Sequence, residues 1–429
     1  MTISADQPTA DSADSANSAD SGHFADSADR KITDQGAAGG HAVDAATDEE
    51  FRAILRAFLD AHSPGPRPKD PRARLGWTRD WQATLYDHGY AGPSFPREVG
   101  GMDLSFSRQV IYREELARAR VPGPLGTGLG IVAPTIVRYG TAEQKQKWLR
   151  PMLRGDEVWC QGYSEPEAGS DLPALRTTAR REGGEYVVNG QKVWTSAGVL
   201  ADVLFCLVRT GPRASRQKGI TYLVIDAHAP GVTIRPLRDL AGGTVFAEVF
   251  FDDVRVPVSN RIGAENGGWQ LVRTSLGHER AAGAMEQAAS YRRVLTELVA
   301  LARERGLTGE PAVRARLADF EIRVRLLRYN AERTVHGILT RGEPGPGSSV
   351  SRLLITAFEQ DLHEFAVDML GPDGIVTKPS EQAVQRGRWL AGFLSTRAST
   401  IGAGTAEIQR NTIAEQVLRL PHDPAMPPR

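Results

Sequence analysis

The sequence predicts an α+β multidomain protein in which two helical regions flank a β-rich middle region. Apolar residues follow a helical period before residue 157 and after residue 263, whereas β-branched and aromatic runs lie between them. Clusters of Gly and Pro separate these segments. We therefore expect an N-terminal α-helical domain, a middle β-barrel or sandwich domain and a C-terminal four-helix bundle.

The first 46 residues differ in composition from the rest of the chain. They repeat Ala, Asp and Ser and carry eight Asp against two basic residues, Arg30 and Lys31. Such a stretch has too few large apolar side chains to offset its ordering entropy, so we expect 1–46 to be a disordered tail. The remaining 47–429 carries 50 basic and 44 acidic residues and is mildly cationic, although the chain's net charge is zero.

Composition argues against several classes of protein. A balanced charge gives no reason to expect nucleic-acid binding, and no apolar run approaches the ~20 residues that span a bilayer. The two cysteines, Cys160 and Cys206, cannot form a disulfide framework and match no metal-ligand spacing. We expect a cytoplasmic protein that contacts neither nucleic acid nor membrane and binds no metal.

The predicted N-terminal α domain covers 47–157. Thr47 followed three residues later by Glu50 is typical of a capping box, and it precedes the amphipathic run FRAILRAFL. Further helical segments, YREELARAR and TAEQKQKWLRPML, alternate with Gly/Pro loops.

The predicted middle β domain covers 158–262. Short β-branched runs such as ADVLFCLVRT and GITYLVID are bounded by Gly, Pro or Asp, without a long helical pattern between them. The segment EYVVNGQKVW contains Asn189-Gly190, a pair that favours a tight turn between two strands. We expect a hairpin there.

The predicted C-terminal bundle covers 263–429. Four amphipathic segments are separated by Gly/Pro turns, and we expect each to form a helix of the bundle. These segments span 269–305, 311–341, 348–370 and 405–420.

One loop at the start of the β region has unusual chemistry. The segment QGYSEPEAGSD, at 161–171, combines serines, a turn through Pro166 and a Gly-Ser pair with accessible N–H groups. Such a loop can hold an anion or a flat heterocycle, although an ordinary surface loop has the same composition.

The full string, with four landmarks around it, resembles the acyl-CoA dehydrogenase family of flavoenzymes. The landmarks are RYGTAEQKQKWLRPMLRGD before the loop, and NGQKVWTSAG, FDDVRVP and GTAEIQRNTIAEQVL after it. The resemblance covers 47–420 and implies FAD as cofactor. It also implies that the loop binds the flavin, through Gln161, Tyr163, Ser164, Gly169 and Ser170.

Trp194 and Ser196 match the family's residues that flank the isoalloxazine. An indole can cover one face of the ring, and a hydroxyl two residues along an extended strand points to the same side. The alternative for Trp194 is a core tryptophan of the β domain. Ser170 is also implied to contact the pantetheine of the substrate.

The resemblance implies that a neighbouring subunit supplies the second half of the flavin site. The matching segments are Asp368–Pro372, with Asp368, Gly371 and Pro372, and Thr405–Glu407, which otherwise read as a Gly turn and a helix N-cap. Asp368 replaces a usual Gln and Pro372 a usual Gly, and the usual Arg-x-x-Phe-Gly element is missing. We expect a homodimer or homotetramer, with a hetero-oligomer possible.

The position of the catalytic base departs from the best-known members, because Ala403 stands where they carry Glu. Other members, which act on branched or bulkier acyl groups, place the Glu before an Arg on the first bundle helix, and this chain has Glu279-Arg280 there. Glu279 is thus the candidate base and Arg280 a candidate contact to CoA. Both could instead be solvated or ion-paired helix residues.

The resemblance implies dehydrogenation of an acyl-CoA or acyl-carrier thioester to the trans-2-enoyl thioester. Glu279 removes the α-proton while a β-hydride passes to flavin N5, and an electron-transfer flavoprotein accepts the electrons. Two alternatives remain: a flavin monooxygenase or oxidase on the same fold, and a catalytically silent subunit of a hetero-oligomer.

Overall fold

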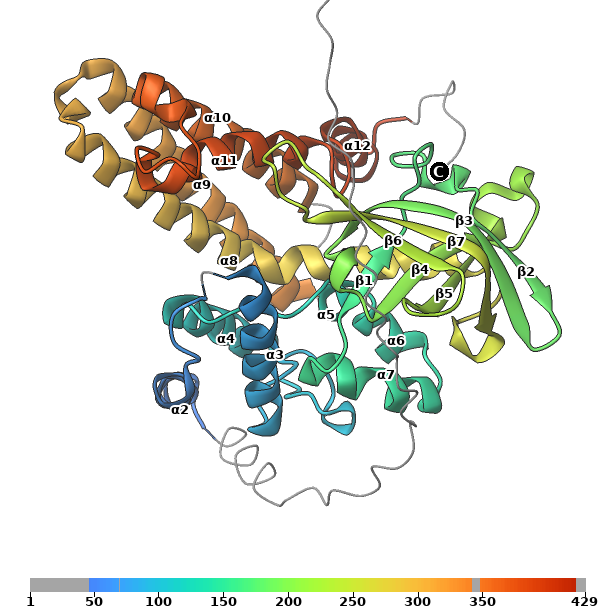
Figure 1. Ribbon diagram of the computed structural model, residues 1–429. Helices are drawn as coiled ribbons and strands as arrows, with labels where there is room; N and C mark the ends of the chain where they lie inside the picture. Colours follow the sequence, from blue (N-terminus) through green and yellow to red (C-terminus); the bar gives the residue numbers. More distant parts are fainter. Residues whose placement is uncertain (1–45, 69, 342–347, 422–429) are drawn as a thin grey trace, which may run out of the picture.

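The computed structural model describes residues 46–68, 70–341 and 348–421. Within its helices, the side chains of residues 71–72, 273–286, 338–339, 341 and 348 lie outside this description. The predicted tail, apart from residue 46, also lies outside it. Three parts follow one another along the described chain: helices, a sheet and a second set of helices (Figure 1).

Among the described residues, six α-helices make up the first part. The predicted capping box is confirmed, because Thr47 Oγ1 accepts from the Glu50 N–H and Glu50 accepts from the Thr47 N–H. The buried carboxylate of Glu115 pairs with three arginines of this part, Arg52, Arg56 and Arg118. The helices are α2 (Asp48–His62), α3 (Pro71–Asp87), α4 (Phe106–Ala119), α5 (Gly128–Ile131), α6 (Ala133–Tyr139) and α7 (Ala142–Arg154).

The middle part is one mixed, eight-stranded sheet. Its order is β6-β7-β3-β2-β4-β5-β8, and β1 pairs in parallel with β4. The strands are β1 (Trp159–Gly162), β2 (Thr178–Glu182), β3 (Glu185–Ser196), β4 (Val203–Arg209), β5 (Ile220–Asp226), β6 (Val232–Leu237), β7 (Phe246–Pro257) and β8 (Arg261–Ile262).

Strand β4 is buried on both faces. Leu204, Cys206 and Val208 pack with β3, β5 and β7 in one core, whereas Phe205 and Leu207 pack against the helices in another. This double burial explains why β4 reads as a continuous apolar run rather than an alternating one.

The predicted hairpin at Asn189-Gly190 is wrong. β3 runs through both residues, and the turn lies instead between Glu182 and Glu185, where β2 pairs antiparallel with β3. Asn189 serves a bulge in β7: its side chain donates to the Asp253 carboxylate and accepts from the Asp253 N–H. Gly190, at φ 147°, is needed because a Cβ would lie 2.7 Å from Cα of Thr177.

In the last part, the described residues form three long α-helices and two short ones. The fourth predicted segment forms only a seven-residue helix with a π-helical turn at Ile413–Val417, and another short helix, which the sequence did not indicate, precedes it. No helix of the described residues is long and apolar enough to cross a membrane. The helices are α8 (Gly268–Glu304), α9 (Pro311–Arg341), α10 (Ser348–Leu370), α11 (Arg388–Thr396) and α12 (Ala406–Thr412).

Helix α8 connects the sheet with the far end of the bundle (Figure 1). Gly268 lies against the backbone of Thr221 and Tyr222 in β5, where a Cβ would come within 2.9 Å. The helix then passes α4, α5 and α6 and spans about 55 Å at 1.5 Å per residue. Features at its two ends are therefore far apart within one chain.

Candidate functional site

The predicted loop leaves β1 and is fixed by a pair of buried tyrosines. Tyr163 is 6 % exposed, and its hydroxyl lies 2.6 Å from that of Tyr222 on β5. The next residue, Ser164, accepts the Val193 N–H through its carbonyl at 2.9 Å. Tyr163 thus serves the core, while Ser164 lies half-buried beside β3. Gln161 is in β1, in register with Phe205.

A buried ion pair lies beneath this loop. The Lys192 side chain is 0 % exposed, and its Nζ donates to Glu165 Oε1 at 2.7 Å and to the Tyr163 carbonyl at 3.1 Å. Burial would raise the pKa of Glu165, but the Lys192 ammonium and the bonds it accepts hold that pKa below its ordinary value. Burial lowers the pKa of Lys192, against the opposing pull of Glu165.

Trp194 stands on a β-bulge rather than on a regular strand. The register with β7 shifts between Lys192 and Thr195, and Trp194 has a left-handed backbone at φ 62°. The expected two-residue alternation between Trp194 and Ser196 therefore does not apply. The indole is 60 % exposed, which argues against the core-tryptophan alternative, and Phe246 packs edge-on to it.

The residues around this bulge suit a flat, polar-edged ring. The exposed indole offers an apolar face, and the half-buried Ser196 follows it. Between them, Thr195 is fully buried, and its hydroxyl is without a hydrogen-bond partner among the described atoms. These features are compatible with a flavin against Trp194.

The loop continues to an exposed tip. Gly169 and Ser170 are exposed, and nothing described lies within 4 Å of a Cβ placed on Gly169. Asp171 then pairs with Arg216 at 2.5 Å, which ties the loop to the turn between β4 and β5. The predicted ligands Ser164 and Ser170 therefore differ: the first is held against β3, the second is open to solvent.

The second predicted group of residues lies on the helices of the last part rather than on the sheet. Asp368 is on the last turn of α10, and Gly371 begins a 3-10 turn, η7 (Gly371–Ile375), that includes Pro372. Asp373 of that turn pairs with Arg305, just past the end of α8, at 2.6 Å. This places the turn at the end of α8 remote from the sheet.

Thr405 and Glu407 lie at the start of α12. The predicted N-cap is confirmed, because Thr405 Oγ1 accepts from the Ile408 N–H at 3.2 Å. Glu407 is exposed in the first turn, where hydrogen bonds from its own backbone N–H and then from the Thr405 side chain lower its pKa. Figure 1 shows α12 on the sheet side of the molecule. By contrast, the Arg305–Asp373 pair holds η7 at the far end of α8.

The candidate base and its neighbour are on α8. Glu279 comes 11 residues after the helix begins, about 17 Å along its axis. The side chains of Glu279 and Arg280 lie outside the described residues. The structure thus gives their place in the chain and on a continuous helix, and no more.

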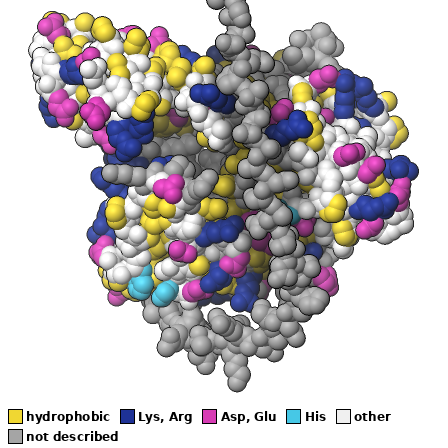
Figure 2. All heavy atoms as spheres, viewed as in Figure 1, with side chains coloured by type: hydrophobic (Ala, Val, Ile, Leu, Met, Phe, Trp, Pro, Cys, Tyr) yellow, Lys and Arg dark blue, Asp and Glu magenta, His cyan; other side chains and the backbone are white. Residues whose placement is uncertain are grey.

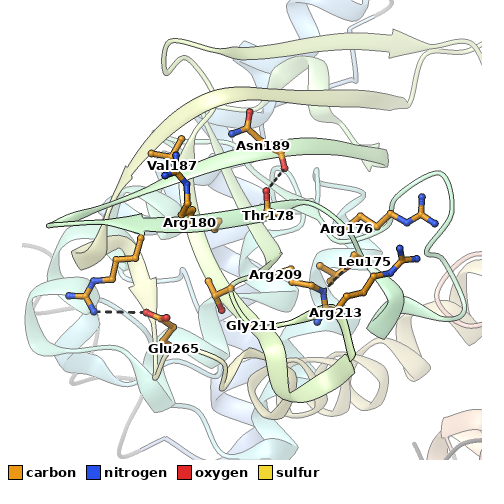
Figure 3. A pocket seen from close by; sticks show the side chains of 13 residues that line it. Leu175, Arg176, Thr178, Arg180, Val187, Asn189, Arg209, Gly211, Arg213 and Glu265 are labelled. Carbon is orange, nitrogen blue, oxygen red and sulfur yellow. Dashed lines mark hydrogen bonds and ion pairs between the residues drawn. The ribbon is translucent and has the colours of Figure 1, made fainter. Parts of the chain in front are cut away.

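A cleft of about 740 Å³ lies beside β2 (Figure 3). Its lining residues begin at Leu175, a few positions after the 161–171 loop. Three of its arginines pair with carboxylates, and acidic side chains lie among basic ones over the sheet in Figure 2. Its buried arginine donates to three carbonyls. The cleft is therefore less cationic than its composition suggests. The arginines are Arg176, Arg180, Arg181, Arg209 and Arg213.

Sequence reasoning missed the Glu165–Lys192 pair, the orphaned Thr195 hydroxyl and the arginine-lined cleft. A lysine within the apolar run of β3 was the available signal for the pair, because a buried lysine needs a carboxylate or carbonyl partner. The partner lies 27 residues away. The sequence alone offers no means of choosing it.

Comparisons with known proteins agree with this arrangement. Residues 45–156, 160–254 and 266–418 match the N-terminal, middle and C-terminal domains of acyl-CoA dehydrogenases. Acyl-CoA dehydrogenase IpdE1 of Mycobacterium tuberculosis is 37 % identical over 384 residues, covering 87 % of this chain and 98 % of that protein.

Two solved structures share the fold closely. The Tcur3481-Tcur3483 steroid ACAD has a TM-score of 0.77 at 32 % identity and covers 88 % of this chain and 98 % of that one. The ChsE4-ChsE5 complex from Mycobacterium tuberculosis has a TM-score of 0.76 at 33 % identity, with 89 % and 100 % covered. The chain belongs to the acyl-CoA dehydrogenase family, whose members are flavin-dependent oxidoreductases of the acyl-CoA CH–CH group.

Proposed function

We propose that this chain uses FAD to dehydrogenate an acyl-CoA thioester to its trans-2-enoyl form, with Glu279 as the base. The observation that carries the proposal is the exposed indole of Trp194, held on a left-handed bulge beside the 161–171 loop, here called the Ser164 loop. An exposed tryptophan on a strained backbone is costly for an isolated fold, and such strain is typical of binding sites.

The chain's own residues would have separate roles in binding the flavin, binding the thioester and removing the proton. Bound FAD would supply the acceptor for the β-hydride. Trp194 would cover one ring face, Ser164 and Ser196 would bond polar ring edges, and Ser170 would meet the pantetheine or a phosphate. Glu279 would take the α-proton, which the thioester carbonyl makes acidic, and Arg280 would contact CoA. Desolvation of Glu279 by the acyl chain would raise its basicity.

The proposed substrate is a bulky, ring-bearing acyl thioester. One structural relative is a steroid ACAD. In the sequence, small residues follow Arg280 (AAGAM) and stand at Gly402-Ala403, and they would leave room for a bulky acyl chain. CoA is the proposed carrier, and an electron-transfer flavoprotein the proposed acceptor.

The proposed assembly is a hetero-oligomer with a related chain. Asp368 and Pro372 depart from the family pattern, which weakens this chain's own second half of the site. Two structural relatives are named for pairs of chains. Native mass spectrometry of the tagged chain purified from its own cells tests this assembly: two different chains support it, and a homotetramer contradicts it.

Reduction of the flavin without oxygen tests the base. Glu279→Gln should keep FAD but lower the rate of bleaching by acyl-CoA by about 10²–10⁴-fold, because a carboxamide accepts no proton. Glu297→Gln is the matched control, since Glu297 is on the same helix and pairs with Arg388 on the bundle. Unchanged reduction in Glu279→Gln would refute the assignment. Bleaching only by reduced nicotinamide would support a monooxygenase instead.

A further inference from the structure

A fully buried charge lies directly behind the Trp194 bulge. Lys192 is two residues before Trp194, and its side chain is 0 % exposed. Its Nζ has two acceptors in the loop, Glu165 Oε1 at 2.7 Å and the Tyr163 carbonyl at 3.1 Å. The lysine therefore joins β3 to the residues on either side of Ser164, through the Tyr163 carbonyl and the Glu165 carboxylate.

Glu165 extends this connection to a third segment. Its carboxylate accepts the N–H groups of Arg176 and Thr177 at 2.5 and 2.9 Å. The Val193 N–H meanwhile donates to the Ser164 carbonyl at 2.9 Å. The loop, the 176–177 segment and β3 thus meet at one ion pair.

A contribution to fold stability does not by itself explain why Lys192 and Glu165 are buried as an ion pair. Removing two charges from water costs much of what their attraction returns, and apolar residues of similar volume are often as stable. Directional bonds do something that apolar packing does not, because they fix one relative position of the groups they join. The groups fixed here carry Ser164 and Trp194.

The bulge itself needs such support. Trp194 has φ 62°, a conformation that bulky residues adopt only where the surroundings enforce it. On one side of the bulge Lys192 is bonded to the loop, and on the other Thr195 is fully buried. These two buried neighbours leave the indole directed outward.

We propose that Lys192 is a positioning residue, which acts through Glu165 and the Tyr163 carbonyl to hold the Ser164 loop and the Trp194 bulge at the separation that binds the flavin. The inference rests on the proposed flavin site. Lys192 itself contacts neither the ring nor the thioester, and its effect reaches them through Ser164 and Trp194.

Lys192→Met tests the proposal, because methionine fills similar space without the charge or the two bonds. The matched control is Glu115→Gln, which removes a buried charge from the Arg52, Arg56 and Arg118 cluster of the N-terminal helices. Both variants should lower the thermal midpoint. FAD affinity is measured from quenching of flavin fluorescence on the full chain in its native assembly.

Lys192→Met should weaken FAD binding by about tenfold or more, the equivalent of one charged hydrogen bond, while Glu115→Gln stays within about twofold of the wild type. Turnover of saturated Lys192→Met should also fall, with KM for the thioester unchanged. Equal FAD affinity and turnover in Lys192→Met and wild type would overturn the proposal.

A second variant covers the case in which Lys192→Met does not fold. Glu165→Asp keeps the charge but withdraws the carboxylate from Lys192 by one methylene, and it should give a smaller loss of FAD affinity in the same direction. Unchanged affinity in a folded Glu165→Asp would contradict the proposal. Absence of FAD binding by the wild-type assembly would refute the proposed function itself, which separates the two failures.

Discussion

The two halves of the predicted flavin site differ in how much of their geometry one chain supplies. Near Trp194, one chain supplies a β-bulge, the buried Lys192–Glu165 ion pair and the 161–171 loop, which is hydrogen-bonded to β3. Around Asp368, the predicted residues lie on an exposed helix end, and the nearby ion pair, Arg305–Asp373, links the helices to one another. Under the proposed function, the first half would hold FAD within one chain, whereas the second would complete the flavin site of another subunit.

The largest effect should come from Gly190→Ala. Its Cβ would lie 2.7 Å from Cα of Thr177 at φ 147°, so overpacking and backbone strain add. We expect a loss of about 2–4 kcal/mol in the free energy of unfolding, measured with denaturant. FAD binding should weaken as well, since Thr177 anchors Glu165.

Gly184→Ala is the control for Gly190→Ala, because nothing described lies within 4 Å of its added Cβ. Equal unfolding free energies for the two variants would show that the Thr177 contact does not constrain the sheet.

Trp194→Ala should remove the ring face and weaken FAD binding by roughly 10- to 100-fold, the range found for aromatic stacking. Because the indole is 60 % exposed, the unfolding free energy of the FAD-free protein should change little. Tyr329→Ala, an equally exposed aromatic on α9, is the control. FAD affinity retained in Trp194→Ala would place the flavin elsewhere.

Caps and turns show what could be predicted from sequence. Thr47 and Thr405 cap their helices as expected, because a cap depends on residues within one turn. The hairpin prediction at Asn189-Gly190 is wrong because contacts with distant segments, rather than a turn, select these two residues. Thr177 leaves no room for a Cβ at Gly190, and the Asn189 side chain bonds Asp253. The fold class and the family followed from ordered motifs, whereas the ion pair under the loop depends on contacts between distant segments. The domain boundaries stay predictions.

Acid should lower the free energy of unfolding through protonation of Glu115 in the N-terminal helices. Burial opposes its ionisation, but the three arginines lower its pKa to about 2, from 4.5. The folded state then binds fewer protons than the unfolded state, so this contribution is complete above pH 4.5 and is lost as the pH falls toward 2. We expect a loss of about 1–2 kcal/mol between neutral pH and pH ~3.

Denaturant unfolding of wild type and Glu115→Gln at both pH values checks this expectation. The difference between the two proteins should shrink in acid. A difference that is independent of pH would contradict the assigned shift.

The smallest effect should come from Asp368→Ala. In a hetero-oligomer whose second half comes from the related chain, FAD affinity should change by less than about twofold, within the scatter of surface substitutions. FAD affinity of the purified assembly gives the readout, with Trp194→Ala alongside as the sensitive case. A tenfold loss would instead indicate a homo-oligomer that uses both halves of this chain.

The mass of the product distinguishes dehydrogenation of the thioester from oxygenation. Ring-bearing acyl-CoA thioesters are incubated with the native assembly and electron-transfer flavoprotein, and the thioester is analysed by mass spectrometry. A dehydrogenase with Glu279 as its base gives a product lighter by two hydrogens, formed with wild type and lost with Glu279→Gln. A product that has gained oxygen, or one that forms equally well without Glu279, would contradict this assignment.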